Sequence, residues 1–141
     1  MSGPLAKLID GKAVASKIRG GCKQRVAALR ARGIEPGLAV VLVGSDPASA
    51  VYVRNKIRAC AEVGIKSFRY DLAETVDTQA VVSLIGRLSA DPAVHGILVQ
   101  LPLPNGLDPR AIVAAIDPAK DVDGLHPFNA GRLASGLPAL T

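Results

Sequence analysis

Two side chains suited to proton transfer, Tyr52 and Lys56, lie four positions apart in a stretch that is predicted to be helical. On a helix this spacing puts both residues on one face, with Cβ atoms about 5 to 6 Å apart. The pair could transfer protons if Lys56 is partly withdrawn from water. A half-buried tyrosine beside a solvated lysine is the alternative, and it is the commoner arrangement for this spacing in an arbitrary helix.

Two further polar positions could bind a ligand. Gln100 interrupts an apolar run near the end of a predicted strand. It is either exposed there or, if buried, in need of partners, in which case its carbonyl could hold the Lys56 ammonium while its amide addresses a ligand. Asp121 to Gly124 resembles part of a calcium loop, but the glycine is misplaced and the closing Glu is missing, so no metal site is predicted. A surface turn and a carboxylate that binds the edge of a heterocycle both remain open.

Alternating helices and strands must position these candidates. Apolar periodicity and caps predict helices over 10–33, 46–63, 77–88 and 108–116, and strands over 38–44, 65–72 and 95–101. This order predicts an α/β fold of three layers, with a parallel sheet between two layers of helices. Ligands bind at the carboxyl ends of strands in such sheets, which is where segments 44–49 and 100–104 fall.

Composition favours one globular domain over residues 1–141, since 49% of the residues are hydrophobic and only 3% aromatic. No stretch reaches the roughly 18 apolar residues of a membrane span. Cys22 and Cys60 have no nearby partner cysteine, which predicts reduced thiols and a cytoplasmic protein. The formal charge of +5 comes from scattered basic residues with few aromatics, so nucleic acid is not an expected partner.

Five segments, taken in order, resemble the bifunctional methylenetetrahydrofolate dehydrogenase/methenyltetrahydrofolate cyclohydrolase family. They are Pro47–Lys56, Val63–Ile65, His95–Pro104, Pro118–Gly124 and Asn129–Leu133. The resemblance implies the N-terminal, folate-binding catalytic half of a two-domain enzyme of cytoplasmic one-carbon metabolism and purine biosynthesis. Such enzymes oxidise 5,10-methylenetetrahydrofolate with NADP and hydrolyse the methenyl product to 10-formyltetrahydrofolate.

The resemblance also assigns roles to the candidate residues. It implies that Lys56 is the main catalytic group and assists hydration of the methenyl carbon by proton transfer. Tyr52 would stack on the aminobenzoyl and pterin region and orient the lysine, Gln100 would place the lysine, and Asp123 would bind the amino-pyrimidine edge of the pterin. The other predicted pocket residues are Val99, Leu101 and Pro102.

The sequence departs from the family at its end, because it stops at Thr141, before the linker and the dinucleotide-binding domain that the family has. The NADP site is therefore expected outside residues 1–141, and the isolated chain is expected to show little dehydrogenase activity. The full-length enzyme is expected to be a homodimer. A folate-binding module without turnover is the alternative function. A short-chain dehydrogenase, which also uses a YxxxK pair, would need a glycine-rich dinucleotide turn that this sequence lacks.

Overall fold

Helices and strands alternate along the chain as predicted. The computed structural model describes residues 9–140. The elements are α1 (Gly11–Arg30), β1 (Gly37–Val43), α2 (Pro47–Val63), β2 (Lys66–Leu72), α3 (Thr78–Ala90), β3 (Gly96–Val99), α4 (Pro109–Ala114) and α5 (Pro127–Ala134). Within residues 9–140, no helix has both the length and the apolar character that crossing a membrane requires.

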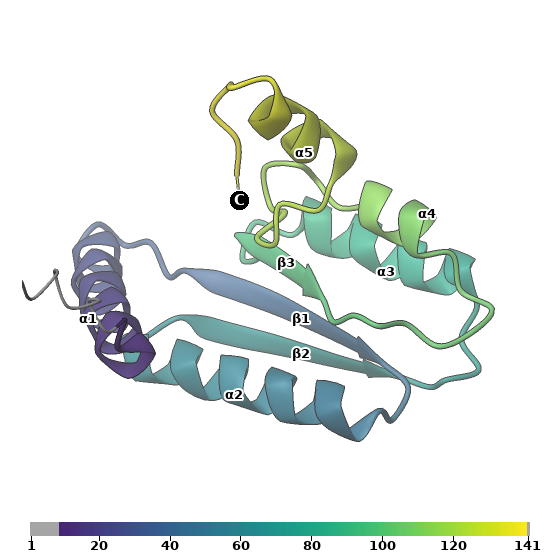
Figure 1. Cartoon of the computed structure of the whole chain (residues 1–141), viewed down its shortest axis with the longest axis horizontal. Helices are drawn as coiled ribbons and strands as arrows, with labels where there is room; N and C mark the ends of the chain where they lie inside the picture. The colour runs from purple at the N-terminus through teal and green to yellow at the C-terminus, as the bar shows by residue number, and fades with distance from the viewer. Residues whose placement is uncertain (1–8, 141) are drawn as a thin grey trace, which may run out of the picture.

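The three strands form one parallel sheet in the order β2–β1–β3. Gly37 lies opposite Lys66 where β1 and β2 begin, and Val43 lies opposite Leu72 where they end. In Figure 1, α2 runs along one face of the sheet, and α3 and α4 lie over the other. The predicted α/β architecture of helix, parallel sheet and helix is confirmed.

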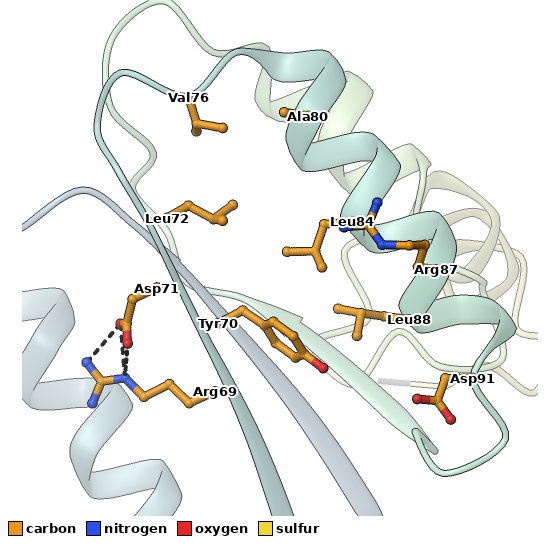
Figure 2. A pocket seen from close by; sticks show the side chains of 10 residues that line it. All are labelled: Arg69, Tyr70, Asp71, Leu72, Val76, Ala80, Leu84, Arg87, Leu88 and Asp91. Carbon is orange, nitrogen blue, oxygen red and sulfur yellow. Dashed lines mark hydrogen bonds and ion pairs between the residues drawn. The ribbon is translucent and has the colours of Figure 1, made fainter.

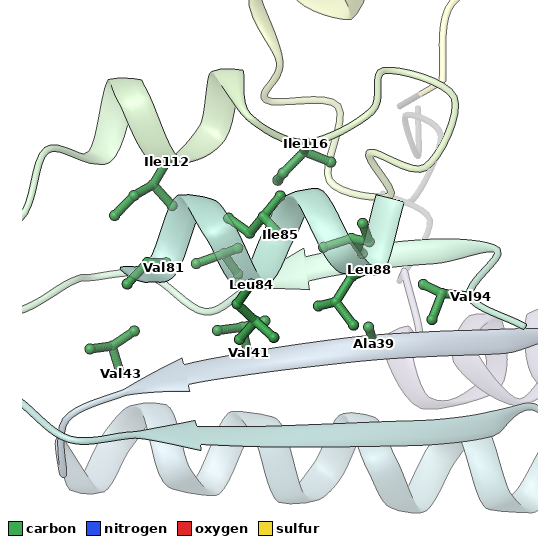
Figure 3. Packing of buried hydrophobic residues seen from close by; sticks show 12 residues of the cluster. Ala39, Val41, Val43, Val81, Leu84, Ile85, Leu88, Val94, Ile112 and Ile116 are labelled. Carbon is green, nitrogen blue, oxygen red and sulfur yellow. The ribbon is translucent and has the colours of Figure 1, made fainter. Parts of the chain in front are cut away.

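Strand β1 is buried on both faces of the sheet, which explains its unbroken apolar sequence. Its side chains alternate: Ala39, Val41 and Val43 pack toward α3, whereas Val40 and Leu42 pack toward α2. The cluster on the α3 side is shown in Figure 3, and its other buried members are Val81, Leu84, Ile85, Leu88, Val94, Ile97, Val99, Ile112 and Ile116. This central strand fixes the helices of both layers.

Helix α2 begins and ends at the signals that predicted it. The Asp46 carboxylate accepts a hydrogen bond from the Ser49 backbone N–H at 2.7 Å, and Pro47 occupies the first turn. At the other end, Gly64 has a φ of +89°, in the left-handed region that favours glycine. Because α2 begins just after β1 ends, the first turns of α2, which include Tyr52 and Lys56, start at the carboxyl end of the sheet.

Two parts of the fold differ from the prediction. Strand β3 ends at Val99, two residues before the predicted end at Leu101. The following Pro102 has no N–H with which to continue a ladder, and the chain turns away. Helix α5 was not predicted: His126 caps it, with Nδ1 accepting the Phe128 N–H at 3.0 Å. Histidine is not one of the usual N-cap residues, so the sequence held no clear start signal.

Candidate active site

Lys56 and Gln100 meet where α2 passes the end of β3. The Gln100 N–H still donates to the Val41 carbonyl of β1 at 2.9 Å, so strand alternation extends one residue past Val99 and puts Gln100 on the same side as Leu98, which packs in the cluster beneath α2. The Lys56 Nζ donates to Gln100 Oε1 at 3.3 Å, and both side chains are half-buried. The Gln100 Nε2 donates to the Leu101 carbonyl at 2.7 Å, which keeps the amide oxygen turned toward the lysine. Gln100 takes one of three ammonium N–H groups, so the lysine can still serve a ligand or water.

Tyr52 lies one helical turn before Lys56 on α2, and 62% of its surface is exposed. The alternative considered from the sequence is a half-buried tyrosine beside a solvated lysine. The structure shows the opposite, because Tyr52 is exposed and Lys56 is half-buried. An exposed phenol ring beside an ammonium group offers a flat apolar face against which a planar ligand can stack. Both residues lie on α2 at the predicted four-residue spacing, which puts them on one face of the helix.

The two segments predicted at the carboxyl ends of the strands do meet. The loop after β1 and the proline-rich loop after β3 enclose a hollow of about 330 Å³. Gly44 has a φ of +79°, and a Cβ there would come within 3.0 Å of the Pro104 ring. The residues lining the hollow are Val43, Ser45, Asp46, Pro47, Glu74, Pro102, Leu103 and Pro104. Pro102 thus lies at the predicted edge of the sheet, although Lys56 is not among the lining residues.

Val99 and Leu101, two of the predicted pocket residues, have different surroundings. Val99 is 5% exposed and belongs to the α3-side core, so its side chain does not line the pocket as predicted, and only its backbone can face a ligand. Leu101 is exposed and lines an apolar hollow of about 430 Å³. The other lining residues of that hollow come from α4, the start of α5 and the chain just before α5, and are Pro109, Arg110, Val113, Leu125 and Pro127.

A larger hollow, of about 670 Å³, lies elsewhere, between β2 and α3 (Figure 2). Tyr70, Leu72 and Leu84 form part of its wall, and the ion pair of Arg69 and Asp71 lies at its edge, with 2.8 Å between Nε and Oδ2. Neither Lys56 nor Gln100 reaches it. Size therefore does not mark the candidate site, which is an open surface at the carboxyl end of the sheet.

The two aspartates of the Asp-Val-Asp-Gly segment have different surroundings. Asp123, the predicted pterin ligand, is exposed in a turn, whereas Asp121 is 1% exposed and forms a parallel bridge with Ile97 of β3. The bridge brings the turn beside β3, the strand that leads into Gln100. Among residues 9–140, no group of three or more His, Cys, Asp or Glu side chains is placed to hold a metal ion. Sequence reasoning missed Asp121, because an Asp-rich segment does not show which carboxylate is buried.

Asp46 is the acidic group at this end of the sheet whose pKa is displaced. Hydrogen bonds from the Ser49 backbone N–H and hydroxyl lower its pKa below the usual 3.8, because they stabilise the ionised carboxylate. The start of α2 therefore carries a negative charge at neutral pH, where it also complements the helix dipole.

The family described as tetrahydrofolate dehydrogenase/cyclohydrolase, catalytic domain, matches this chain over residues 9–123. Bifunctional protein FolD of Rhodopseudomonas palustris (strain BisB18) is 61% identical over 137 residues, which is 96% of this chain and 46% of that protein. The chain thus spans about half the length of the relatives that it matches.

Solved structures agree in fold. The bifunctional FolD methylenetetrahydrofolate dehydrogenase/cyclohydrolase from Campylobacter jejuni superposes with a TM-score of 0.91 and 48% identity, over 93% of this chain and 46% of that one. The Trypanosoma brucei methylenetetrahydrofolate dehydrogenase-cyclohydrolase, solved with NADP and an inhibitor, gives 0.86 and 40%, over 93% and 45%. The family match over residues 9–123 covers both α2, with Tyr52 and Lys56, and the segment that contains Gln100 and Asp123. The chain belongs to the tetrahydrofolate dehydrogenase/cyclohydrolase family, through the catalytic domain that the family's description names.

Proposed function

We propose that this chain supplies the folate site and the catalytic lysine of a bifunctional enzyme. The two reactions are oxidation of 5,10-methylenetetrahydrofolate and hydrolysis of the resulting methenyl group to 10-formyltetrahydrofolate. The contact between Lys56 and Gln100 carries the proposal, because it joins two elements distant in sequence at the ligand-binding end of a parallel sheet. The names of the matched FolD proteins support the same chemistry.

In the proposed mechanism Lys56 moves a proton while water adds to the methenyl carbon. Gln100 Oε1 accepts from the Lys56 ammonium and directs its remaining N–H groups outward. Tyr52 holds the folate by stacking through its exposed ring. Asp123 accepts hydrogen bonds from the amino-pyrimidine edge of the pterin. Leu101 and Pro102 contact the ligand from the loop after β3.

The cofactor of the oxidation is proposed to bind outside these residues. Bound NADP would accept the hydride, but residues 1–141 contain no glycine-rich dinucleotide turn that could cradle its phosphates. We assign the NADP site to a dinucleotide-binding domain beyond this folate-binding domain, and the homodimer to the complete protein. A cytoplasmic role in one-carbon metabolism, with formyl groups passing to purine biosynthesis, is part of the same proposal.

Folate binding without turnover is the second candidate. It is favoured by the open surroundings of the site, since Tyr52 is 62% exposed. A site open to water on one side holds its ligand less rigidly, and rigid placement is a large part of catalysis. The two candidates use the same residues and differ only in whether Lys56 turns the ligand over.

The test measures hydrolysis of 5,10-methenyltetrahydrofolate by the unchanged chain and by Lys56→Gln. The loss of the substrate's absorbance monitors the reaction. Loss of a proton-transferring group should lower kcat by about 100-fold to 10,000-fold and change KM much less. Lys17→Gln is the matched control, because Lys17 is an exposed lysine on α1, away from the site. It should keep the activity of the unchanged chain.

Three results separate the candidates. Equal activity of Lys56→Gln and Lys17→Gln would refute the catalytic role of Lys56. Tight binding of tetrahydrofolate without turnover, weakened in Asp123→Asn, would establish the second candidate. A folded chain that neither binds nor hydrolyses folates would overturn both.

A further inference from the structure

The segment that carries Asp123 is held in place by a buried polar cluster that the sequence did not reveal. We propose that Asp121 and Asn129 are positioning residues, which fix the turn from Asp121 to Gly124 so that Asp123 is presented to the folate. This inference rests on the proposed function, in which Asp123 binds the pterin. It goes further by assigning a role in folate affinity to two residues that the turn and α5 keep away from solvent.

Asp121 is the centre of the cluster. Its side chain is buried, and Oδ2 accepts from the His126 backbone N–H at 2.8 Å and from Asn129 Nδ2 at 3.1 Å, while Oδ1 accepts from the Leu125 N–H at 3.3 Å. All three partners are donors, and all three follow the turn in the chain. The carboxylate at the start of the turn therefore holds the residues that come after it. A buried polar group with its partners satisfied holds one geometry, because each lost bond leaves a donor without water.

Asn129 ties the same turn to α5. It is 3% exposed, and its Nδ2 donates both to Asp121 and to the Pro118 carbonyl at 2.8 Å. One amide group of α5 therefore links Asp121 to Pro118, which precedes it in the chain. This contact explains why a polar residue is buried in the short helix α5, which follows the turn directly.

The segment is also anchored to the body of the domain on the side before the turn. Lys120 Nζ donates to the Ser89 carbonyl at 2.7 Å and the Asp91 carbonyl at 2.9 Å, where α3 ends. The Lys120 carbonyl in turn accepts the Ile97 N–H of β3 at 2.7 Å. With α3 and β3 on one side and α5 on the other, the turn has rigid supports at both ends.

Asp123 itself is exposed between these supports, so its position depends on the backbone of the turn. The turn is closed by the Gly124 N–H, which donates to the Asp121 carbonyl at 3.4 Å, and Gly124 has a φ of +67°. Loss of the Asp121 carboxylate would free the residues on both sides of Asp123. A ligand would then have to order the turn as it binds, and its affinity would fall accordingly.

The first test is tetrahydrofolate binding by calorimetry in a double-mutant cycle of Asp121→Asn and Asp123→Asn. Asp121→Asn puts an amide N–H₂ where a donor already points, and it should weaken binding by about tenfold or more. If Asp121 acts through Asp123, adding Asp121→Asn to Asp123→Asn should change the affinity by less than about twofold. A merely structural role would weaken both backgrounds equally, which would overturn the inference. Asp71→Asn, the same change at an exposed position of β2, is the control and should bind normally.

The second test needs no ligand. Amide hydrogen exchange at Leu125 and His126 should accelerate by about tenfold or more in Asp121→Asn, with the amides of β1 unchanged. Should Asp121→Asn fail to fold, Asn129→Ala removes only one of the three donors and should show the same pattern more weakly. Unchanged exchange in a folded variant would overturn the positioning role whatever the ligand does.

The proposed function can fail separately. Binding that is weakened in Asp123→Asn but unaffected by Asp121→Asn would leave the proposed function intact and refute only the positioning role. No binding of tetrahydrofolate by the unchanged, folded chain would refute the proposed function and with it the role of the cluster in affinity.

Discussion

The packing of Val122 on Gly96 makes a single methyl group a sensitive probe of the Asp121–Gly124 turn. A Cβ added at Gly96 would lie 2.5 Å from Val122 Cγ1 and 3.3 Å from Leu38 Cδ1. Carbon atoms in contact prefer about 3.5 to 4.0 Å, so Gly96→Ala must push Val122 away by about 1 Å. Leu38 can adjust the end of its side chain, but Val122 has few rotamers and moves with the turn.

Two opposing effects set the size of the change. Overpacking of this kind costs about 1 to 3 kcal/mol. Replacing glycine by alanine returns about 0.4 to 1 kcal/mol by restricting the unfolded chain, since Gly96 is not among the glycines with positive φ. The cost of overpacking exceeds this gain, so Gly96→Ala should lower the free energy of unfolding by about 1 to 2 kcal/mol.

Removing the Val122 methyl groups should relieve the clash, because the nearest remaining Val122 atom, Cβ, lies 3.9 Å from the added Cβ. In urea unfolding, Gly96→Ala combined with Val122→Ala should be more stable than the sum of the single changes predicts, by about 1 kcal/mol. Gly86→Ala is the control: no atom lies within 4 Å of its Cβ position on α3, so it should gain about 0.5 to 1 kcal/mol. Additive effects of Gly96→Ala and Val122→Ala would refute the close packing of the turn on β3.

Three other changes test the fold around the site. Asp46→Asn should make stability depend less on pH in the acid range. The lowered pKa of Asp46 contributes stability above pH 3.8, and this contribution disappears as the pH falls through the pKa of Asp46 in the folded state. Acid titration followed by circular dichroism would reveal the difference. An unchanged pH dependence in the acid range would contradict this. Ile85→Ala, at a fully buried position of α3, should lower the free energy of unfolding in urea by about 2 to 5 kcal/mol, and a loss below 1 kcal/mol would refute its place in the core. Lys120→Met should remove the donors at the end of α3 and speed amide exchange next to β3, which exchange mass spectrometry would detect; protected amides there would show that Lys120 anchors nothing.

Much of the fold could be predicted because its signals are local. The Asp46 and Pro47 start of α2, the Gly64 end and the apolar run of β1 each depend on a few neighbouring residues. The four-residue spacing of Tyr52 and Lys56 fixes their common face once the helix forms. Strand, helix and strand in alternation then leave the parallel sheet as the natural arrangement, and the structure has it.

Contacts between distant segments could not be predicted in the same way. Lys56 and Gln100 are 44 positions apart, and their hydrogen bond depends on how α2 packs on β3. No local pattern distinguished Val99, whose side chain enters the core, from Leu101, which lies at the surface. Two residues make that difference, because the strand ends between them and alternation no longer decides the direction of the side chain.

By itself, the sequence determined the elements up to α4, their order and the helical face that carries the candidate catalytic pair, since hydrogen bonding and side-chain periodicity act over a few residues. Tertiary structure alone decided that the first aspartate of the Asp-Val-Asp-Gly segment is buried and the second is exposed. Pairing beside β3 and the Asn129 amide of α5 select Asp121 as the buried acceptor. Burial of a carboxylate depends on donors that arrive from other parts of the chain, and only the packed domain brings them together.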